Sequence, residues 1–181
     1  MQFSVIDPIS CDLSALSIAL EQNHVPSWKK QFWRDVEEKE AGLSSAIGLY
    51  TFGLLHGKSR RPWYVGKTSA KGGYKCEIFT EHKLNHYHLL LKKRGQPFFV
   101  FMPLRTSSGS LSKNFSGGAT TIQWVEKRLI TYALDRNPEL LNRKDTRFPK
   151  EVFLPGLIGV QPKGKRSAQA QLARGLFGGH G

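Results

Sequence analysis

The sequence predicts an α/β fold in which two paired strands, a helix, a third strand and a long final helix follow one another. Two runs rich in aromatic and branched residues, 46–55 and 63–68, flank a polar turn, which is the pattern of a β-hairpin. Apolar periodicity then predicts a helix over 74–94, a strand over 97–104 and a second helix over 119–136. These segments together predict one compact domain with a core of its own.

Breaking residues set the limits of the predicted helices. Gly95 ends the first helix, and the Asn137-Pro138 pair ends the second, which a Ser/Gly-rich loop at 106–118 precedes. Two shorter helices are predicted upstream, over 12–23 and 27–40, with Asp12 and Ser27 as caps. The chain is therefore expected to divide into an N-terminal helical extension (1–45), a central domain (46–142) and a basic C-terminal extension (143–181).

Composition favours a protein of a reducing cellular compartment. A chain of 181 residues with 39% hydrophobic content can form a core without disulfides, and Cys11 and Cys76 lack the spacing of a metal site. Acidic residues interrupt every apolar run near the N-terminus, and no run approaches the roughly 20 residues of a membrane span. We therefore expect a soluble, cytoplasmic protein with no membrane partner.

Charge gives the first indication of function. The sequence has 27 Lys and Arg against 14 Asp and Glu, a formal net charge of +13, with the excess mostly downstream of residue 56. Such a field attracts polyanions, so nucleic acid is the expected partner. A basic surface kept for solubility and attraction to an anionic membrane are the alternatives.

Several basic residues are candidates for nucleic-acid contacts. Beyond residue 143 they are spread among glycines and prolines, which predicts either a basic arm on DNA or a tail without a role. The candidates are Lys71, Lys83, His86, Arg143, Lys144, Lys163, Lys165 and Arg166.

Glu126 is the most informative single residue. On the wheel of the helix predicted over 119–136, Ile122, Leu129, Ile130 and Ala133 fall on the same side as its carboxylate. A carboxylate on an apolar stripe needs a metal, a cation or a proton. Helix position alone leaves two interpretations open, a metal ligand and a core ion pair with Lys or Arg.

The helix predicted over 74–94 carries titratable groups on one face. Lys75 and His82 are seven residues apart and His86 follows one turn later, which places all three on one side of a continuous helix. No further His or Cys completes a zinc set. The pattern predicts an active-site or DNA-facing cluster, with a partly buried structural role as the alternative for His86.

The predicted hairpin places Tyr50 and Tyr64 on paired strands, each close to a glycine, Gly48 and Gly66. A strand glycine commonly marks a close approach of the backbone, and ordinary cross-strand packing would explain the tyrosines equally well. The run Gly-Lys-Thr at 66–68 lacks the upstream glycine and the following helix of a phosphate-binding loop. Nucleotide binding is not expected.

Taken together, these residues resemble the GIY-YIG nuclease superfamily over residues 46–142. The likeness is carried by Gly48-Leu49-Tyr50, by Tyr64-Val65-Gly66 thirteen residues later, and by the downstream Glu126 and Asn142. The resemblance implies a three-stranded antiparallel sheet flanked by helices and divalent-metal-dependent cleavage of DNA. Ile78 departs from the pattern, because the family usually has an arginine at that position of the first helix.

The resemblance also implies roles for these residues. Tyr50 would activate or orient water, Tyr64 and His82 would contact the scissile phosphate, and Glu126 would hold Mg²⁺ or Mn²⁺. Lys67 and Lys75 are the candidates that could supply the positive charge of the missing arginine. Lysine is a point charge and cannot form the two parallel hydrogen bonds of an arginine. Asn142 would orient a catalytic group or the DNA backbone. Duplex DNA is the expected substrate. A nucleic-acid-binding module without catalysis and a nuclease of RNA are the alternatives.

Overall fold

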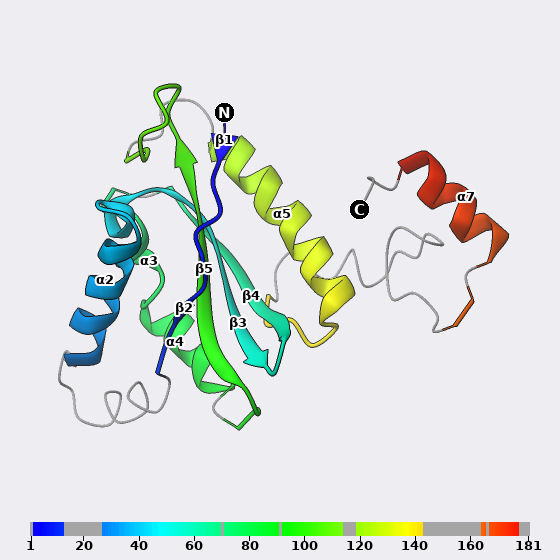
Figure 1. Cartoon of the computed structure of the whole chain (residues 1–181), viewed down its shortest axis with the longest axis horizontal. Helices are drawn as coiled ribbons and strands as arrows, with labels where there is room; N and C mark the ends of the chain where they lie inside the picture. The colour runs from blue at the N-terminus through cyan, green and yellow to red at the C-terminus, as the bar shows by residue number, and fades with distance from the viewer. Residues whose placement is uncertain are drawn as a thin grey trace.

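A computed structural model describes residues 2–12, 27–69, 71–90, 92–113, 119–142, 164–165 and 167–177. Its centre is an antiparallel sheet in which β3 (Gly48–His56) lies between β4 (Ser59–Thr68) and β5 (Gln96–Arg105) (Figure 1). The predicted α/β class and the three central strands are confirmed. The hairpin turn is tighter than expected, because most of the polar run between the two predicted strands lies within the strands, and only Gly57 and Lys58 form the turn.

The sheet has five strands and not the predicted three. The short strands β1 (Gln2–Phe3) and β2 (Ile9–Ser10) both pair with the outer edge of β5. Two-residue strands show no alternation in sequence, so a pattern-based prediction could not find them. Residues assigned to a separate helical extension therefore supply strands to the central sheet.

Helices cover both faces of the sheet. On one side lie α2 (Ser27–Lys39), α3 (Tyr74–Glu77) and α4 (Glu81–His88), and on the other lies α5 (Ala119–Arg136) (Figure 1). We call these sides the α4 face and the α5 face. The predicted helices over 27–40 and 119–136 are confirmed, whereas residues 13–23 of the helix predicted over 12–23 lie outside the described residues.

The main core is aromatic and lies on the α4 face. It is formed by fully buried rings of the central strands, which make edge-on contacts with rings of α2 and of the α3–α4 region. Its aromatic members include Phe32, Tyr50, Phe52, Tyr74, Tyr87, Phe99 and Phe101. A smaller aliphatic cluster on the α5 face joins Val65 of β4 to Ile130, Ala133 and Leu134 of α5.

The helix predicted over 74–94 is interrupted. α3 ends at Glu77, and α4 begins only after Thr80, whose backbone is extended with φ −70° and ψ 152°. Ile78, between the two helices, is fully buried in the aromatic core, which anchors the linking segment. The interruption overturns the expectation that Lys75 and His82 share one helical face.

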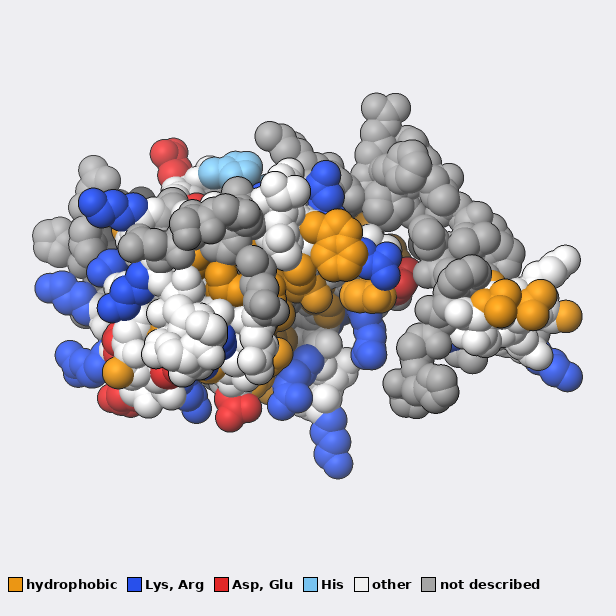
Figure 2. Space-filling view, turned by 90° about the horizontal axis from the view of Figure 1, so that it is seen from above, with side chains coloured by type: hydrophobic (Ala, Val, Ile, Leu, Met, Phe, Trp, Pro, Cys, Tyr) orange, Lys and Arg blue, Asp and Glu red, His pale blue; other side chains and the backbone are white. Residues whose placement is uncertain are grey.

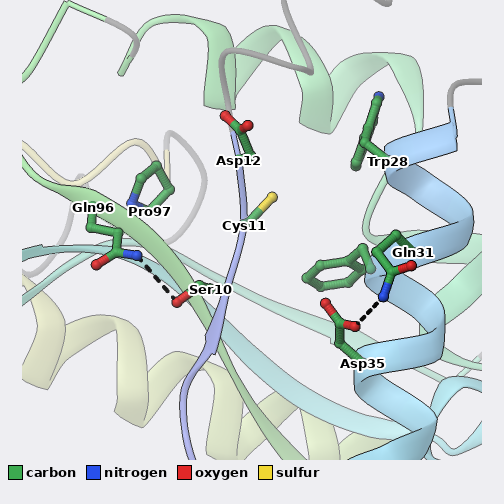
Figure 3. Close-up of a pocket in the computed structure, with 9 residues that line it drawn as sticks. Ser10, Cys11, Asp12, Trp28, Gln31, Asp35, Gln96 and Pro97 are labelled. Carbon is green, nitrogen blue, oxygen red and sulfur yellow. Dashed lines mark hydrogen bonds between the residues drawn. The ribbon is translucent and has the colours of Figure 1, made fainter.

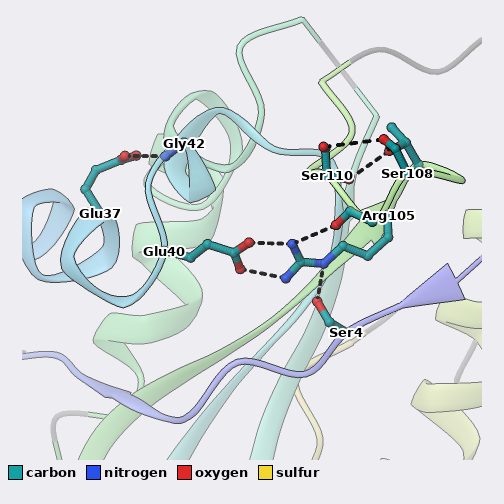
Figure 4. Close-up of polar contacts among 9 residues, drawn as sticks. Ser4, Glu37, Glu40, Gly42, Arg105, Ser108 and Ser110 are labelled. Carbon is teal, nitrogen blue, oxygen red and sulfur yellow. Dashed lines mark hydrogen bonds and ion pairs between the residues drawn. The ribbon is translucent and has the colours of Figure 1, made fainter.

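Two acidic side chains fix the segment after α2 (Figure 4). Glu40 forms a two-pronged ion pair with Arg105 at the end of β5, with Oε2 2.6 Å from Nη2 of the arginine, and Ser4 accepts a bond from Nε of Arg105. Glu37 accepts hydrogen bonds from the backbone N–H groups of Gly42, at 2.6 Å, and Ser44, at 3.0 Å. These contacts join the N-terminal strands, α2 and β5 into one unit.

The described part of the C-terminal extension contains one helix, α7 (Ala168–Phe177), drawn beyond α5 in Figure 1. Among the helices that the structure describes, none is long and apolar enough to cross a membrane.

Candidate active site

Polar side chains meet on the α4 face beside β4. The Nζ atom of Lys83, from α4, donates a hydrogen bond of 2.6 Å to the Tyr64 hydroxyl on β4 and lies 3.1 Å from Oε1 of Glu77, from α3. The imidazole of His86 stacks on the Tyr64 ring with centroids 5.6 Å apart, and its Nε2 lies 3.2 Å from Nε2 of His82. We call Tyr64, Glu77, His82, Lys83 and His86 the Tyr64 cluster.

The cluster is shielded at its base and open at its rim. Tyr64 is buried and the Lys83 side chain is only 13% exposed, whereas His82 is exposed and His86 is partly so. The interruption of the predicted helix produces this arrangement, because α4 turns Lys83 toward the sheet and leaves His82 at the surface. A phosphate approaching from solvent would meet the imidazoles before the ammonium.

Lys83 keeps its charge in this position. Burial by itself would lower the pKa of its ammonium, but the Tyr64 hydroxyl and the Glu77 carboxylate outweigh that cost and raise the pKa above the ordinary value. The Nζ atom also lies 4.8 Å from the centroid of the Tyr64 ring, where the π face favours a cation. The cluster therefore holds a permanent positive charge against a phenol hydroxyl.

Tyr50 lies deeper than its expected role requires. Its side chain is fully buried, burial raises its pKa well above the ordinary value, and Tyr87 beside it is equally buried with a raised pKa. No described group accepts or donates a hydrogen bond of normal geometry to either hydroxyl. A phenol so placed does not reach bulk water, so Tyr50 packs behind the Tyr64 cluster and does not line its open side.

Gly66 permits that packing. Tyr50 and Gly66 are cross-strand partners, and a Cβ atom at position 66 would overlap the Tyr50 ring. The close approach expected at a strand glycine is confirmed at Gly66. The segment Tyr64-Val65-Gly66 thus contributes the Tyr64 side chain to the cluster. Because Gly66 has no side chain, the Tyr50 ring can pack directly against this segment.

Lys67 and Glu126 lie on the other face of the sheet. Residues 64 and 67 differ by an odd number of strand positions, so their side chains point to opposite faces, and Lys67 meets α5. Its Nζ atom is 2.9 Å from Oε2 of Glu126, with side chains 32% and 15% exposed respectively. Glu126 is partly buried on the apolar side of α5, and the partner of its carboxylate is a lysine.

The described residues around Glu126 do not form a metal site as they stand. One of its carboxylate oxygens is hydrogen-bonded to the Lys67 ammonium, and no group of three or more His, Cys, Asp or Glu side chains converges among the described residues. Mg²⁺ keeps several waters in proteins and is usually bound through one or two carboxylates plus substrate phosphates. The Lys67 ammonium occupies an oxygen of Glu126 that such an ion would need, so the arrangement matches the ion-pair interpretation of Glu126.

Asn142 has a structural position beside Tyr64. Its Oδ1 accepts a bond of 2.9 Å from the N–H of Val65, and its Nδ2 donates one of 2.7 Å to the carbonyl of the same residue. Leu141 donates to the Trp63 carbonyl, and Asn137 donates to the Pro62 carbonyl. The segment after α5 therefore satisfies the free edge of β4, which holds the strand that carries Tyr64.

The remaining predicted residues lie apart from the cluster. Lys75 is exposed on α3, and its charge lowers the pKa of Glu37 near α2. Lys71 and Lys165 are exposed. Arg143, Lys144, Lys163 and Arg166 lie outside the described residues.

Sequence reasoning missed Glu77 and Tyr87 and misplaced Lys83. Lys83 was expected at a nucleic-acid surface, but it is part of the cluster's shielded base. Glu77 carried no signal, because on a continuous helix it lies on a different side from Lys83. The four-residue spacing of Lys83 and Tyr87 on an apolar helix face was the one available indication of a lysine turned inward.

Two described cavities lie away from the cluster. One of about 570 Å³ is formed between β2, α2 and the start of β5, and Asp12, Trp28 and Asp35 line it (Figure 3). No residue of the Tyr64 cluster lines it. The cluster is therefore a surface site suited to an extended substrate more than to an enclosed small molecule.

Comparisons of the chain with protein-family models, curated proteins and solved structures gave no match.

Proposed function

We propose that this protein is an endonuclease that hydrolyses phosphodiester bonds of DNA, with the Tyr64 cluster as its active site. The observation that carries the proposal is the ammonium of Lys83, held 2.6 Å from the Tyr64 hydroxyl beneath two histidines that reach the surface. Phosphodiester hydrolysis needs stabilisation of negative charge at phosphorus and proton transfer at two oxygens. The cluster contains groups of both kinds within a few ångströms.

Lys83 supplies the positive charge that the reaction needs. A preorganised cation that remains charged and shielded from solvent stabilises the developing phosphorane charge more than a solvated lysine would. Glu77 is a positioning residue, because its carboxylate holds Nζ on the side of Tyr64. A lysine with a purely structural role would need only the Glu77 carboxylate. The additional hydrogen bond from Lys83 to the Tyr64 hydroxyl therefore favours a catalytic role for Lys83.

The proton transfers fall to the histidines and the phenol. Histidine is the most frequent general base in proteins, and His82 is exposed at the rim, so it accepts the proton of the attacking water. The new bond joins the water oxygen to phosphorus, and the bond to the leaving ester oxygen breaks. The Tyr64 proton passes to that oxygen while Lys83 stabilises the phenolate, and His86, stacked on the ring and bonded to His82, orients both groups.

The electrostatics of the chain support a polyanionic substrate. The net charge is +13, and Lys and Arg side chains project around much of the outline in Figure 2. DNA is proposed over RNA because of the motif resemblance alone. Mg²⁺ or Mn²⁺ enters the proposal on the same ground, as a requirement to be measured.

The test is cleavage of supercoiled plasmid by the full chain, with Mg²⁺, with Mn²⁺ and with a chelator, beside a folded RNA. Tyr64→Phe keeps the ring and its stack on His86 but removes the hydroxyl, and the rate is expected to fall about 100-fold. Tyr74→Phe is the matched control, because its buried hydroxyl bonds the Leu49 carbonyl away from the cluster. Equal rates for the two variants would contradict the proposed active site.

A binding module without catalysis is the second candidate. It is favoured by Glu126, whose carboxylate is occupied by Lys67, and by Ile78 at the position where the family has arginine. Plasmid that is bound but left intact under every metal condition would select this candidate. Cleavage of RNA alone would retain the chemistry and change the substrate.

A further inference from the structure

The outward face of α5 carries an aromatic stripe that the nuclease proposal does not use. Trp124 and Tyr132 are eight residues apart and therefore on one side of the helix, about 12 Å along its axis. Trp124 is 62% exposed and Tyr132 is 56% exposed. We call Trp124, Arg128 and Tyr132 the α5 stripe.

The stripe is not part of the core. The inward face of α5 is formed by Ile122, Ile130 and Ala133, which are buried. Large aromatic side chains with more than half of their surface in water are unfavourable for a protein that has no use for them. Their position on the opposite side of the helix indicates a surface on which something else packs.

Arg128 arranges the two rings. Its guanidinium carbon lies 5.9 Å from the Trp124 ring centroid and 5.5 Å from the Tyr132 centroid, and Nη2 donates a 3.3 Å bond to the Tyr132 hydroxyl. No described carboxylate forms an ion pair with Arg128. The stripe is thus an ordered set of two rings with an uncompensated cation between them.

The charges on the exposed face of α5 indicate which kind of partner binds the stripe. Lys127 and Arg136 are also exposed on α5, against one exposed carboxylate, Asp135, because Glu126 is paired with Lys67. Bases of every kind stack on exposed aromatic rings, and a cation between two rings can contact the phosphates of the strand that runs between the stacked bases. Trp, Tyr and Arg are also frequent at protein interfaces, but the further basic residues on this face favour a polyanion, and a duplex would keep its bases stacked on each other.

We propose that the α5 stripe binds unpaired bases of a nucleic acid, with Trp124 and Tyr132 as stacking platforms and Arg128 on the phosphates of the strand segment that links the two stacked bases. The inference depends on the proposed function only in taking a nucleic acid as the partner. The stripe and the Tyr64 cluster lie on opposite faces of the sheet, so substitutions separate binding from cleavage.

The experiment measures the affinity of the full chain for a labelled oligothymidylate and for a hairpin duplex by fluorescence anisotropy. Trp124→Ala and Tyr132→Ala are each expected to weaken oligothymidylate binding about tenfold and to leave duplex binding within twofold. Arg128→Lys retains the charge and loses the planar contacts, so an intermediate loss is expected. Tryptophan emission should be quenched on binding, and Trp124→Phe should remove that quenching while it keeps most of the affinity.

Leu89→Ala is the matched control, because Leu89 is exposed to the same extent as Tyr132 and lies just after α4. Sedimentation of each variant shows whether the stripe instead joins two copies. Unchanged oligothymidylate affinity in both alanine variants, or loss of a dimer in place of loss of binding, would overturn the inference. Stripe-dependent binding without any plasmid cleavage would uphold it while the nuclease proposal fails.

Discussion

The two faces of the sheet each bring a lysine against a carboxylate, with different consequences. On the α5 face Lys67 meets Glu126 one to one, and the charges neutralise each other. On the α4 face Lys83 is more deeply buried, and its ammonium contacts both the Glu77 carboxylate and the hydroxyl of Tyr64. The first pair stabilises a helix on a sheet, whereas the second also places the ammonium against a phenol hydroxyl.

The largest expected effect comes from removing the charge on the α4 face. Lys83→Met preserves the volume of the side chain and its contact with the Tyr64 ring, but it abolishes the ammonium. Loss of one preorganised electrostatic group typically lowers kcat by about 10²–10³-fold. Plasmid cleavage rates, with thermal melts to establish folding, measure it.

Lys58→Met is the control for this loss, because Lys58 lies exposed in the turn between β3 and β4 and its removal changes the net charge equally. If Lys83→Met and Lys58→Met cleave at similar rates, Lys83 is a structural residue and the contrast between the faces disappears.

Asn142→Ala is expected to destabilise the strand that carries Tyr64 without touching either lysine. The substitution leaves the N–H and carbonyl groups of Val65 without their side-chain partner. Unsatisfied buried groups of this kind cost about 2–3 kcal/mol in total. Urea unfolding measures the loss, and a variant as stable as the parent would show that solvent reaches this edge of β4.

Glu126→Gln addresses the α5 face. The pair is partly exposed, so its loss should cost about 1–2 kcal/mol, between the values for surface and fully buried pairs. Cleavage per folded molecule should change little, and adding Lys67→Met should recover part of the stability. A stable but inactive Glu126→Gln protein would instead make Glu126 a metal ligand and transfer catalysis to the α5 face.

The smallest effect concerns Glu37, far from both lysines. Burial would raise the pKa of its carboxyl, but hydrogen bonds from Ser44 and Gly42 outweigh burial and lower the pKa. Its contribution is therefore present above the ordinary value of 4.5 and is lost as the pH falls through the lowered folded value. Glu37→Gln should cost about 1 kcal/mol at neutral pH and less in acid, as melts across that range would show.

Strong local patterns predicted the fold where they existed. The helix over 119–136, the hairpin and β5 were found because periodicity and breaking residues agreed along their length. β1 and β2 were missed because two residues carry no period, and they are fixed by pairing with β5. The break at 78–80 was missed because burial of Ile78, a tertiary effect, overrides the helical pattern.

The sequence predicted several residues of the candidate site but not how they are arranged. Tyr64 and His82 do meet through His86, and the helical wheel predicted the burial of Glu126. The wheel could not choose between a metal and a lysine, because Lys67 approaches from another element. Lys83 was interpreted as a surface residue, because its contacts with Tyr64 and Glu77 come from other elements that the helical pattern does not show.

The pairing of the first residues with β5 constrains how the chain can fold during synthesis. Ser4 bonds to Arg105, 101 positions later, so this edge of the sheet stays open until β5 has been synthesised. The β3–β4 hairpin can form early because its strands adjoin, whereas closing so long a loop is slow. The outer edge of β5 is therefore expected to be covered after the hairpin has formed.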